Sequence, residues 1–335
     1  MKRLDYVDVA RGIGIILVAT GHSILFPMCG TLHIPLFFML SGFLCSTESL
    51  EGKEYGSLTV KRAKRLIMPY VFYSVLLVLI YGAKELIRGS FTLSGILKAA
   101  GGCLYSTAVL YSNVSPQDNV HFLVAGNEGL WFLTSLVVAS VLFYTIVFVV
   151  MKKQLNIWKM AVSAAVLIAA AYGLNRLPVY LPWGVDAACL GSVFMLLGFF
   201  IRNIKWEERF YGFFVLFIIP FVVLHGINGS ANMAIHDYGK NMILFVITGM
   251  CGALFLFGVG KIFSMIPYVR NGLAYVGKNT LFILAFHTLT FGAISKVFGF
   301  AGDFYWMIQV VVSVGICLVA KEILVRIVKV PGKWL

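Results

Sequence analysis

The chain has 335 residues, of which 60% are hydrophobic and 12% are charged, and its formal net charge is +13 at pH 7. Its mean hydropathy is +0.91. Soluble domains usually carry about a quarter charged residues, so this composition excludes an ordinary soluble globule. It also excludes a disordered chain, because apolar side chains dominate and polar low-complexity tracts are missing. We therefore expect an integral membrane protein that crosses the bilayer several times.

Windows of about 20 apolar residues predict ten membrane-spanning helices. The windows are continuously apolar and do not alternate, which favours helices over the strands of a barrel. The first window is interpreted as a helix of the protein, not a cleaved signal peptide, because Arg11 and His22 interrupt it and no small-residue cleavage site follows. In chain order the windows cover 9–27, 31–47, 66–83, 130–151, 158–173, 186–201, 210–226, 242–260, 279–297 and 304–325.

The distribution of basic residues predicts the orientation of these helices. With the N-terminus in the cytoplasm, 20 of the 27 Lys and Arg residues fall in inner segments, six fall in outer segments, and Arg11 lies within the first span. This bias matches the positive-inside rule, with both termini cytoplasmic. The basic excess is thus explained by topology, and no nucleic-acid partner is expected. The predicted location is the plasma or inner membrane, with the protein embedded among its lipids.

We find no internal repeat and no second domain, so residues 1–335 are expected to form one all-α bundle of about ten transmembrane helices. One connection, residues 84–129, is long and is predicted to lie outside the cytoplasm. Its apolar stretch around Phe91–Leu97 and its Gly101-Gly102 break indicate an interfacial or re-entrant helix. The six cysteines form no C-x-x-C pair, so neither a disulfide framework nor a metal site is expected.

The first span carries two ionisable side chains, Arg11 and His22, whose burial in a membrane costs free energy. An ionisable group at mid-bilayer costs about 2.5–3.5 kcal/mol, so each needs a reason to be there. Their spacing of 11 residues is about three helical turns, which places both on one face about 16 Å apart. Asp8 lies three residues before Arg11 and can pair with it. In a structural interpretation Arg11 is an anchor and His22 a helix contact. The shared face favours a functional pair, in which neutral His22 accepts a proton from a hydroxyl.

The second span contains His33, Pro35 and the Ser41-Gly42 pair. We expect Pro35 in the first turn of a helix, where proline is well tolerated. The small residues Ser41 and Gly42 allow a neighbouring helix to approach closely. Packing alone explains this segment as well as a functional role for His33 and Ser41 does, so both interpretations remain open.

A basic cluster, Lys61-Arg62-Ala63-Lys64-Arg65, precedes the third span at the cytoplasmic boundary. Its simplest interpretation is a positive-inside anchor. Arg62 and Arg65 are three residues apart, however, and therefore present two guanidinium groups on one helix face. That arrangement suits the phosphates of a bound nucleotide.

Three further residues are candidates with equally plausible structural roles. Glu128 and Trp131 lie at the outer start of the fourth span, where Trp131 also suits an aromatic belt and Glu128 a solvated loop. His287 lies inside the ninth span and raises the same question as His22.

In combination, these segments resemble the integral-membrane acyltransferase family 3, particularly its fucose 4-O-acetylase-like members. The resemblance follows the chain in order and covers most of it. It rests on Asp8, Arg11-Gly12 and His22, on His33-x-Pro35-x-Phe37-Phe38 with Ser41-Gly42-Phe43, on Arg62-x-x-Arg65 with Leu66 and Pro69-Tyr70, on Trp131-Phe132-Leu133, and on His287.

The resemblance implies transfer of an acyl group, usually acetyl, from cytoplasmic acyl-CoA to a hydroxyl of a cell-surface or lipid-linked sugar. A direct transfer to a hydroxyl activated by His22 needs no metal, and none is expected. The resemblance also implies that Arg11 and His22 match the first-helix pair required for activity and that Arg62 and Arg65 match the R-x-x-R pair. On this hypothesis Arg62 and Arg65, helped by Lys61 and Lys64, hold the CoA phosphates.

His22 would then act as the base, and Arg11 would orient the pantetheine arm or stabilise the oxyanion. Trp131 and Glu128 would bind the sugar. The alternatives are a transporter or flippase for a lipid-linked glycan and a membrane sensor or anchoring module. Whether the chain forms a homo-oligomer stays open.

Overall fold

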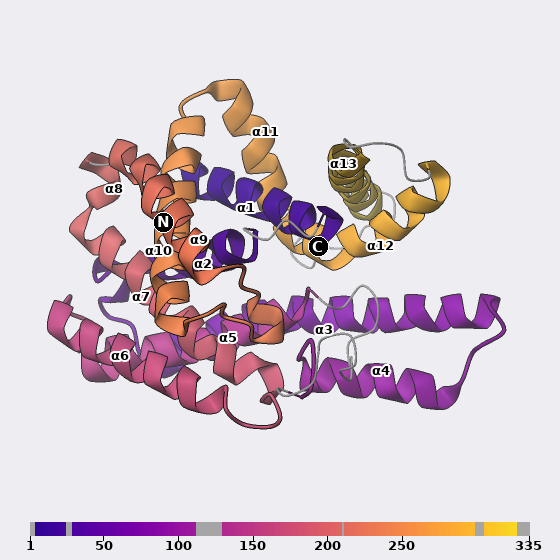
Figure 1. Cartoon of the computed structure of the whole chain (residues 1–335), viewed down its shortest axis with the longest axis horizontal. Helices are drawn as coiled ribbons and strands as arrows, with labels where there is room; N and C mark the ends of the chain where they lie inside the picture. The colour runs from indigo at the N-terminus through magenta and orange to yellow at the C-terminus, as the bar shows by residue number, and fades with distance from the viewer. Residues whose placement is uncertain (1–3, 25–28, 112–128, 210, 299–304, 327–335) are drawn as a thin grey trace.

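The computed structural model describes residues 4–24, 29–111, 129–209, 211–298 and 305–326. It confirms the all-helical membrane fold (Figure 1). The α-helices are α1 (Asp5–Ile24), α2 (Cys29–Phe43), α3 (Tyr55–Ile87), α4 (Leu93–Tyr105), α5 (Trp131–Thr145), α6 (Ile157–Leu174), α7 (Val185–Ile204), α8 (Trp206–Arg209), α9 (Ile218–Asn228), α10 (Met242–Phe263), α11 (Pro267–Lys278), α12 (Thr280–Phe298) and α13 (Tyr305–Arg326). A π-helical stretch, Ile146–Val150, extends α5, and short 3-10 helices cover Glu48–Leu50, Pro182–Gly184, Tyr211–Phe217 and Met233–Ile235.

Within the described residues, eight helical segments are long and apolar enough to cross a membrane. Every one of the ten predicted windows contains a helix, but α1 and the 15-residue α2 are not among those eight. The number of spans and the side on which the termini lie remain predictions. The eight segments cover Tyr55–Ile87, Trp131–Val150, Ile157–Leu174, Pro182–Ile204, Tyr211–Asn228, Met242–Phe263, Thr280–Val297 and Tyr305–Arg326.

The structure places the predicted inner segments at the start of α1 and at the ends of α2, α7 and α10 together at one end of the bundle. Near the start of α1, Tyr6 packs against Phe43 at the end of α2, with ring centroids 6.1 Å apart. Two basic side chains cover these rings: Lys261 Nζ lies 3.9 Å from the Tyr6 centroid and Arg202 Cζ 5.5 Å from that of Phe43. We call this the basic end.

Two of the predicted outer segments, the α1–α2 and α9–α10 connections, meet at the opposite end, where α1 ends and α2 begins. A side chain at Gly21 of α1 would lie 3.1 Å from Cβ of Cys29. A side chain at Gly30 would collide with the carbonyl oxygen of Ala231, in the connection between α9 and α10. We call this the loop end. The two ends agree with the predicted separation of inner and outer segments.

Helix α3 is longer than the predicted third span, because it begins at Tyr55 and continues to Ile87. The basic cluster at 61–65 was excluded from the apolar window, yet it continues the same helix. Helix α4 lies alongside α3 and forms a hairpin with it that projects from the bundle (Figure 1). The Tyr70 hydroxyl joins the two helices by donating to the Cys103 carbonyl. The helix expected within residues 84–129 is therefore present as α4.

The position of Pro35 differs from the prediction. Helix α2 begins at Cys29, so Pro35 lies in the second turn and not in the first. A proline there cannot donate to the Thr31 carbonyl four residues earlier. The sequence signal was misleading because the helix starts with Cys29 and Gly30, which carry no capping signature.

Glycines allow the central helices to approach at backbone distance. Added side chains at Gly42 and Gly198 would collide with the carbonyl oxygens of Met195 and Met39, respectively, so α2 and α7 meet along a reciprocal seam. The prediction that the Ser41-Gly42 pair permits close helix approach is thus confirmed at Gly42.

We expect Gly198→Ala to destabilise the protein by about 1–3 kcal/mol, because the new methyl group must push the backbone of α2 away. Gly173→Ala is the matched control: Gly173 also lies in a helix, and no atom lies within 4 Å of its added Cβ. Thermal unfolding in detergent should show a lower Tm for Gly198→Ala and an unchanged or higher Tm for Gly173→Ala. Equal shifts in the two variants would contradict the seam.

Candidate active site

A cavity of about 680 Å³ lies between the helices and extends toward both ends of the bundle. Its volume is within the range of about 300–1,000 Å³ that is typical of small-ligand sites. Its walls come from α1, α2, α3, α5, α11 and α12, and from connections at the loop end. The charged, imidazole, hydroxyl and amide side chains in the wall are Arg11, His22, His33, Ser41, Arg62, Arg65, Ser230, Asn232, Asp237, Lys278 and Thr280.

Four cationic side chains line the basic part of this cavity: Arg11, Arg62, Arg65 and Lys278. They come from α1, α3 and α11. Helix α11 is fixed against α1, because Gly277 packs directly on the Asp8 carbonyl. Four cations around one hollow favour a ligand that carries several negative charges, such as phosphate groups.

Arg11 is held by the acid that precedes it by one turn. Its Nη1 lies 3.5 Å from Oδ1 of Asp8, and the Asp8 side chain is buried. Since Asp8 lies on the N-terminal side of Arg11, the ion pair directs the guanidinium toward the basic end and away from His22. The predicted pairing of Asp8 with Arg11 is confirmed.

His22 is an exposed residue that lines the cavity three turns further along α1. Its ring centroid lies 5.1 Å from that of His287, on α12, with an angle of 60° between the ring planes. The two intramembrane histidines that the sequence singled out separately are therefore neighbours. His287 is completely buried and does not itself line the cavity.

Backbone carbonyls fix the tautomer of His287. Its Nδ1 lies 2.9 Å from the Ile283 carbonyl oxygen and 3.1 Å from that of Leu284. A carbonyl oxygen can only accept a hydrogen bond, so Nδ1 carries the hydrogen. Nε2 then presents its lone pair, and it is buried with no hydrogen-bond partner among the described residues. Repulsion between like charges disfavours protonating both rings of the pair at once.

Aromatic rings from α2 and α5 form another part of the cavity wall, and Phe37 lies beside Gly14 near the middle of α1. Trp131 begins α5 and is buried while lining the cavity. Phe132 packs edge-to-face on Trp131 at 6.3 Å and lies 5.8 Å from Phe37 of α2, centroid to centroid. His33 and Ser41 of α2 also face the cavity. This part of the wall is apolar except for His33 and Ser41.

The structure brings most of the predicted site residues together around one cavity, with Asp8 and His287 directly behind its wall. Lys61 and Lys64 are exceptions, because they are exposed on α3 and do not line the cavity. On the helix, Lys64 lies about 100° from Arg65 and about 160° from Arg62, whereas Lys61 lies about 100° from Arg62 but only about 40° from Arg65. Glu128 lies outside the described residues. Among those residues, no three His, Cys, Asp or Glu side chains gather as metal ligands would.

The sequence did not single out Lys278 or the segment 230–237 as parts of the site. Lys278 was counted only as a cytoplasmic charge, although its place directly before the ninth span was a usable signal. Segment 230–237 reaches the cavity through long-range packing between the α9–α10 connection and the start of α2. Nothing in the local sequence indicates that packing.

Comparison with known proteins supports a transferase. No curated protein and no solved structure matches the chain. The model of the acyltransferase 3 family, described as an acyltransferase domain, matches residues 4–321 and thus includes every residue of the cavity wall. The chain therefore belongs to the acyltransferase 3 family and is a multi-pass membrane acyltransferase.

Proposed function

We propose that the protein transfers an acyl group, acetyl in the simplest case, from cytoplasmic acyl-CoA to a hydroxyl of a cell-surface or lipid-linked sugar, in the plasma or inner membrane. The observation that carries the proposal is that His22 lines the same cavity as Arg62 and Arg65. A single cavity can therefore hold the phosphates of a donor at one end and its thioester beside an imidazole. The family assignment favours this transferase over the transporter, flippase and sensor alternatives.

The donor enters from the basic end in this account. Arg62 and Arg65 bind the CoA phosphates, with Lys278 adding charge from α11. Guanidinium groups suit this task, because each offers planar pairs of N–H donors to phosphate oxygens. The pantetheine arm then follows the cavity past Arg11 toward His22, about 16 Å further along α1.

His22 acts as the general base. It takes the proton of the acceptor hydroxyl while the oxygen attacks the thioester carbonyl, which forms the new C–O bond. The tetrahedral intermediate then breaks its C–S bond, and the CoA thiolate receives the proton from His22. Atoms and charges balance without a metal or a covalent acyl-enzyme. His287 is a positioning residue, since its fixed neutral ring lies beside His22 and restricts the orientation of that imidazole.

The two roles that the sequence left open for Arg11 differ in geometry. An oxyanion donor must reach the carbonyl at His22, but the Arg11 guanidinium is drawn by Asp8 toward the basic end. We therefore assign Arg11 to orienting the donor arm. Trp131 offers a flat apolar face in the cavity wall, on which the acceptor sugar stacks.

Label transfer tests the proposal. Purified protein is incubated with acetyl-CoA radiolabelled in the acetyl group and with a panel of p-nitrophenyl glycosides and glycolipid fractions. We expect label in an alkali-labile ester of at least one acceptor, together with an equal amount of free CoA thiol. Release of thiol without ester, or uptake of a glycolipid into vesicles without any label transfer, would contradict the proposal.

A further inference from the structure

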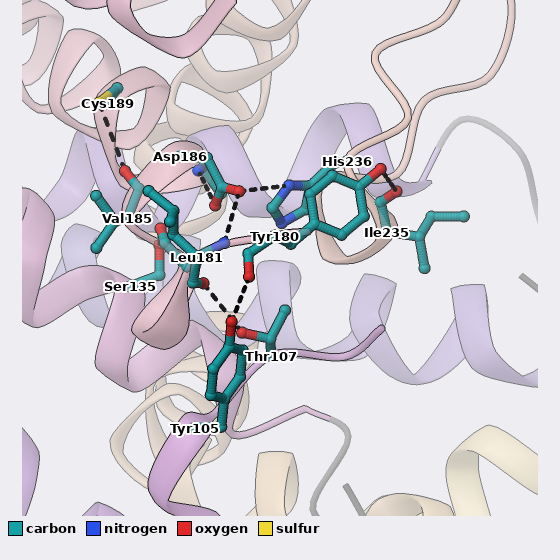
Figure 2. Close-up of polar contacts among 12 residues, drawn as sticks. Tyr105, Thr107, Ser135, Tyr180, Leu181, Val185, Asp186, Cys189, Ile235 and His236 are labelled. Carbon is teal, nitrogen blue, oxygen red and sulfur yellow. Dashed lines mark hydrogen bonds and ion pairs between the residues drawn. The ribbon is translucent and has the colours of Figure 1, made fainter. Parts of the chain in front are cut away.

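A second buried polar cluster lies at the loop end, outside the cavity. Asp186, in the first turn of α7, accepts hydrogen bonds from the backbone N–H groups of Ala187 at 2.9 Å and Leu181 at 3.4 Å. Its Oδ2 lies 3.0 Å from Nδ1 of His236. The Tyr180 ring packs against the His236 imidazole, with centroids 3.8 Å apart and an angle of 43° between the ring planes. Figure 2 shows these three side chains meeting between α7 and the α9–α10 connection.

This cluster is costly to maintain. The Asp186 and His236 side chains are each only 1% exposed. A buried carboxylate is tolerated only when it is paired and hydrogen-bonded. In addition, His236 adopts a left-handed backbone conformation with φ of 55°, which is uncommon for non-glycine residues, although His, like Asn and Asp, adopts it more readily than the others. A feature with these costs indicates that the segment carrying His236 must be held in one position.

The cluster fastens three separate segments of the chain to one another. The Tyr180 hydroxyl donates to the Ile235 carbonyl at 3.4 Å. The Tyr180 and Leu181 carbonyls accept from the Tyr105 hydroxyl at 2.7 Å and the Thr107 hydroxyl at 3.1 Å (Figure 2). We define the collar as residues 104–109, 180–183 and 230–237.

The collar forms the wall of the cavity at the loop end. Ala108 and Val109 line it from the first segment, and Ser230, Asn232 and Asp237 line it from the third. Within the third segment, an isolated β-bridge pairs Asn232 with Asp237. Buried Met233 lies between them and packs into the core. The third segment is thus a compact loop with polar side chains toward the cavity and an apolar anchor toward the protein.

The chemistry of the collar is opposite to that of the basic end. Arginine and lysine side chains line the basic end, whereas a hydroxyl, an amide and a carboxylate line the collar. The collar's carboxylate repels the polyphosphate of a CoA donor. Together these groups accept and donate hydrogen bonds in the way that neighbouring sugar hydroxyls require.

We propose that the collar is the acceptor subsite, that Asn232 and Asp237 bind hydroxyls of a neutral sugar there, and that Asp186 and His236 are positioning residues that hold segment 230–237 in place. This inference rests on the proposed function and adds the place of acceptor recognition. Asp186 and His236 do not line the cavity, so they act on the acceptor only through the loop.

Two replacements of His236 separate positioning from general stability. His236→Asn keeps a polar amide near Asp186 and suits the left-handed backbone. His236→Gly also suits that backbone but removes the partner of Asp186. His225→Ala is the control, because His225 lies on α9, stacks on Phe221 and does not line the cavity.

The KM of each substrate is measured with radiolabelled acetyl-CoA and the best p-nitrophenyl glycoside from the panel. We expect His236→Gly to raise the glycoside KM at least tenfold while the acetyl-CoA KM changes less than twofold. We expect His236→Asn and His225→Ala to stay within about threefold of the unaltered protein for both substrates. An unchanged glycoside KM in His236→Gly, or an equal rise in both KM values, would overturn the proposal.

Hydrogen–deuterium exchange of the same proteins gives a readout that does not depend on activity. His236→Gly should speed exchange in peptides covering 230–238 and leave exchange in the peptides of α1 unchanged. His236→Asn should leave exchange unchanged in both regions. Unchanged exchange at 230–238 would refute the positioning role even if the protein transfers no label. If exchange rises as expected and the unaltered protein transfers no label, the loop anchoring stands and the proposed function fails.

Discussion

We expect His22→Ala to lower kcat for acyl transfer by about 10²- to 10⁴-fold, the usual contribution of a general base. The acceptor hydroxyl would then have to lose its proton without a positioned base as it attacks the thioester. The KM for acyl-CoA should change little, because His22 lies about three turns from the cations assigned to the phosphates. Steady-state kinetics on purified protein, at matched amounts of folded enzyme, measure both quantities.

His225→Ala is the matched control, since it also removes an imidazole but at a site outside the cavity. It should keep kcat within about twofold. A His22→Ala enzyme with full kcat would refute the base assignment. A loss of folded protein in His22→Ala, seen as a collapsed gel-filtration profile, would indicate a structural histidine instead.

Replacing Arg62 or Arg65 by Ala is expected to raise the KM for acyl-CoA by about 10- to 150-fold in each case. Hydrogen bonds to charged groups contribute about 1.5–3 kcal/mol, and about 1.4 kcal/mol corresponds to a tenfold change. The acceptor KM should not follow, because the proposal places the acceptor and the phosphates at different ends of the cavity. Titrations of acyl-CoA at saturating acceptor, and of acceptor at saturating acyl-CoA, separate the two values.

Helix α3 supplies its own controls for this experiment. Lys61 and Lys64 carry the same charge within the same five residues, but they do not line the cavity. Lys61→Ala and Lys64→Ala should therefore raise the acyl-CoA KM less than threefold. Equal effects of all four replacements would show a diffuse attraction between the basic helix and the donor, and would contradict a specific phosphate clamp at Arg62 and Arg65.

Most of the helical architecture could be predicted from the sequence, because hydrocarbon thickness requires long apolar windows and leaves few alternatives. The errors lie where polar residues extend a helix beyond the membrane. Helix α3 continues through the basic cluster to begin at Tyr55, and α11 is an additional helix after Pro267. Neither segment is apolar enough to be recognised by hydropathy.

The site could be predicted in part for a related reason. Several site residues are polar side chains in or next to apolar helices, and the free-energy cost of placing them there marked them as candidates. These residues are Arg11, His22, Arg62, Arg65 and His287. The convergence of the first four on one cavity, and the neighbouring rings of His22 and His287, depend on packing between distant helices.

The collar could not be predicted at all. Its polar residues, His236 among them, occur in connections where polar residues are common and therefore carry no signal in the sequence. Asp186 lies at the first position of the predicted 186–201 span, where an acidic residue is ordinary at a helix start. Only the structure shows that the two side chains are buried against each other.

The central claim is that one cavity holds the phosphates of acyl-CoA at the arginine pair and its acyl group beside His22. Photo-crosslinking tests this claim most directly. The probe is an acyl-CoA whose acyl chain carries a diazirine, and the adducts are located by mass spectrometry. We predict adducts on cavity-lining residues of α1 close to His22, such as Val18, and on the wall around Leu284. Excess CoA and the Arg62→Ala, Arg65→Ala double variant should both suppress them. Adducts confined to exposed residues of α3 such as Val75 and Leu79, or adducts that excess CoA does not reduce, would contradict the account.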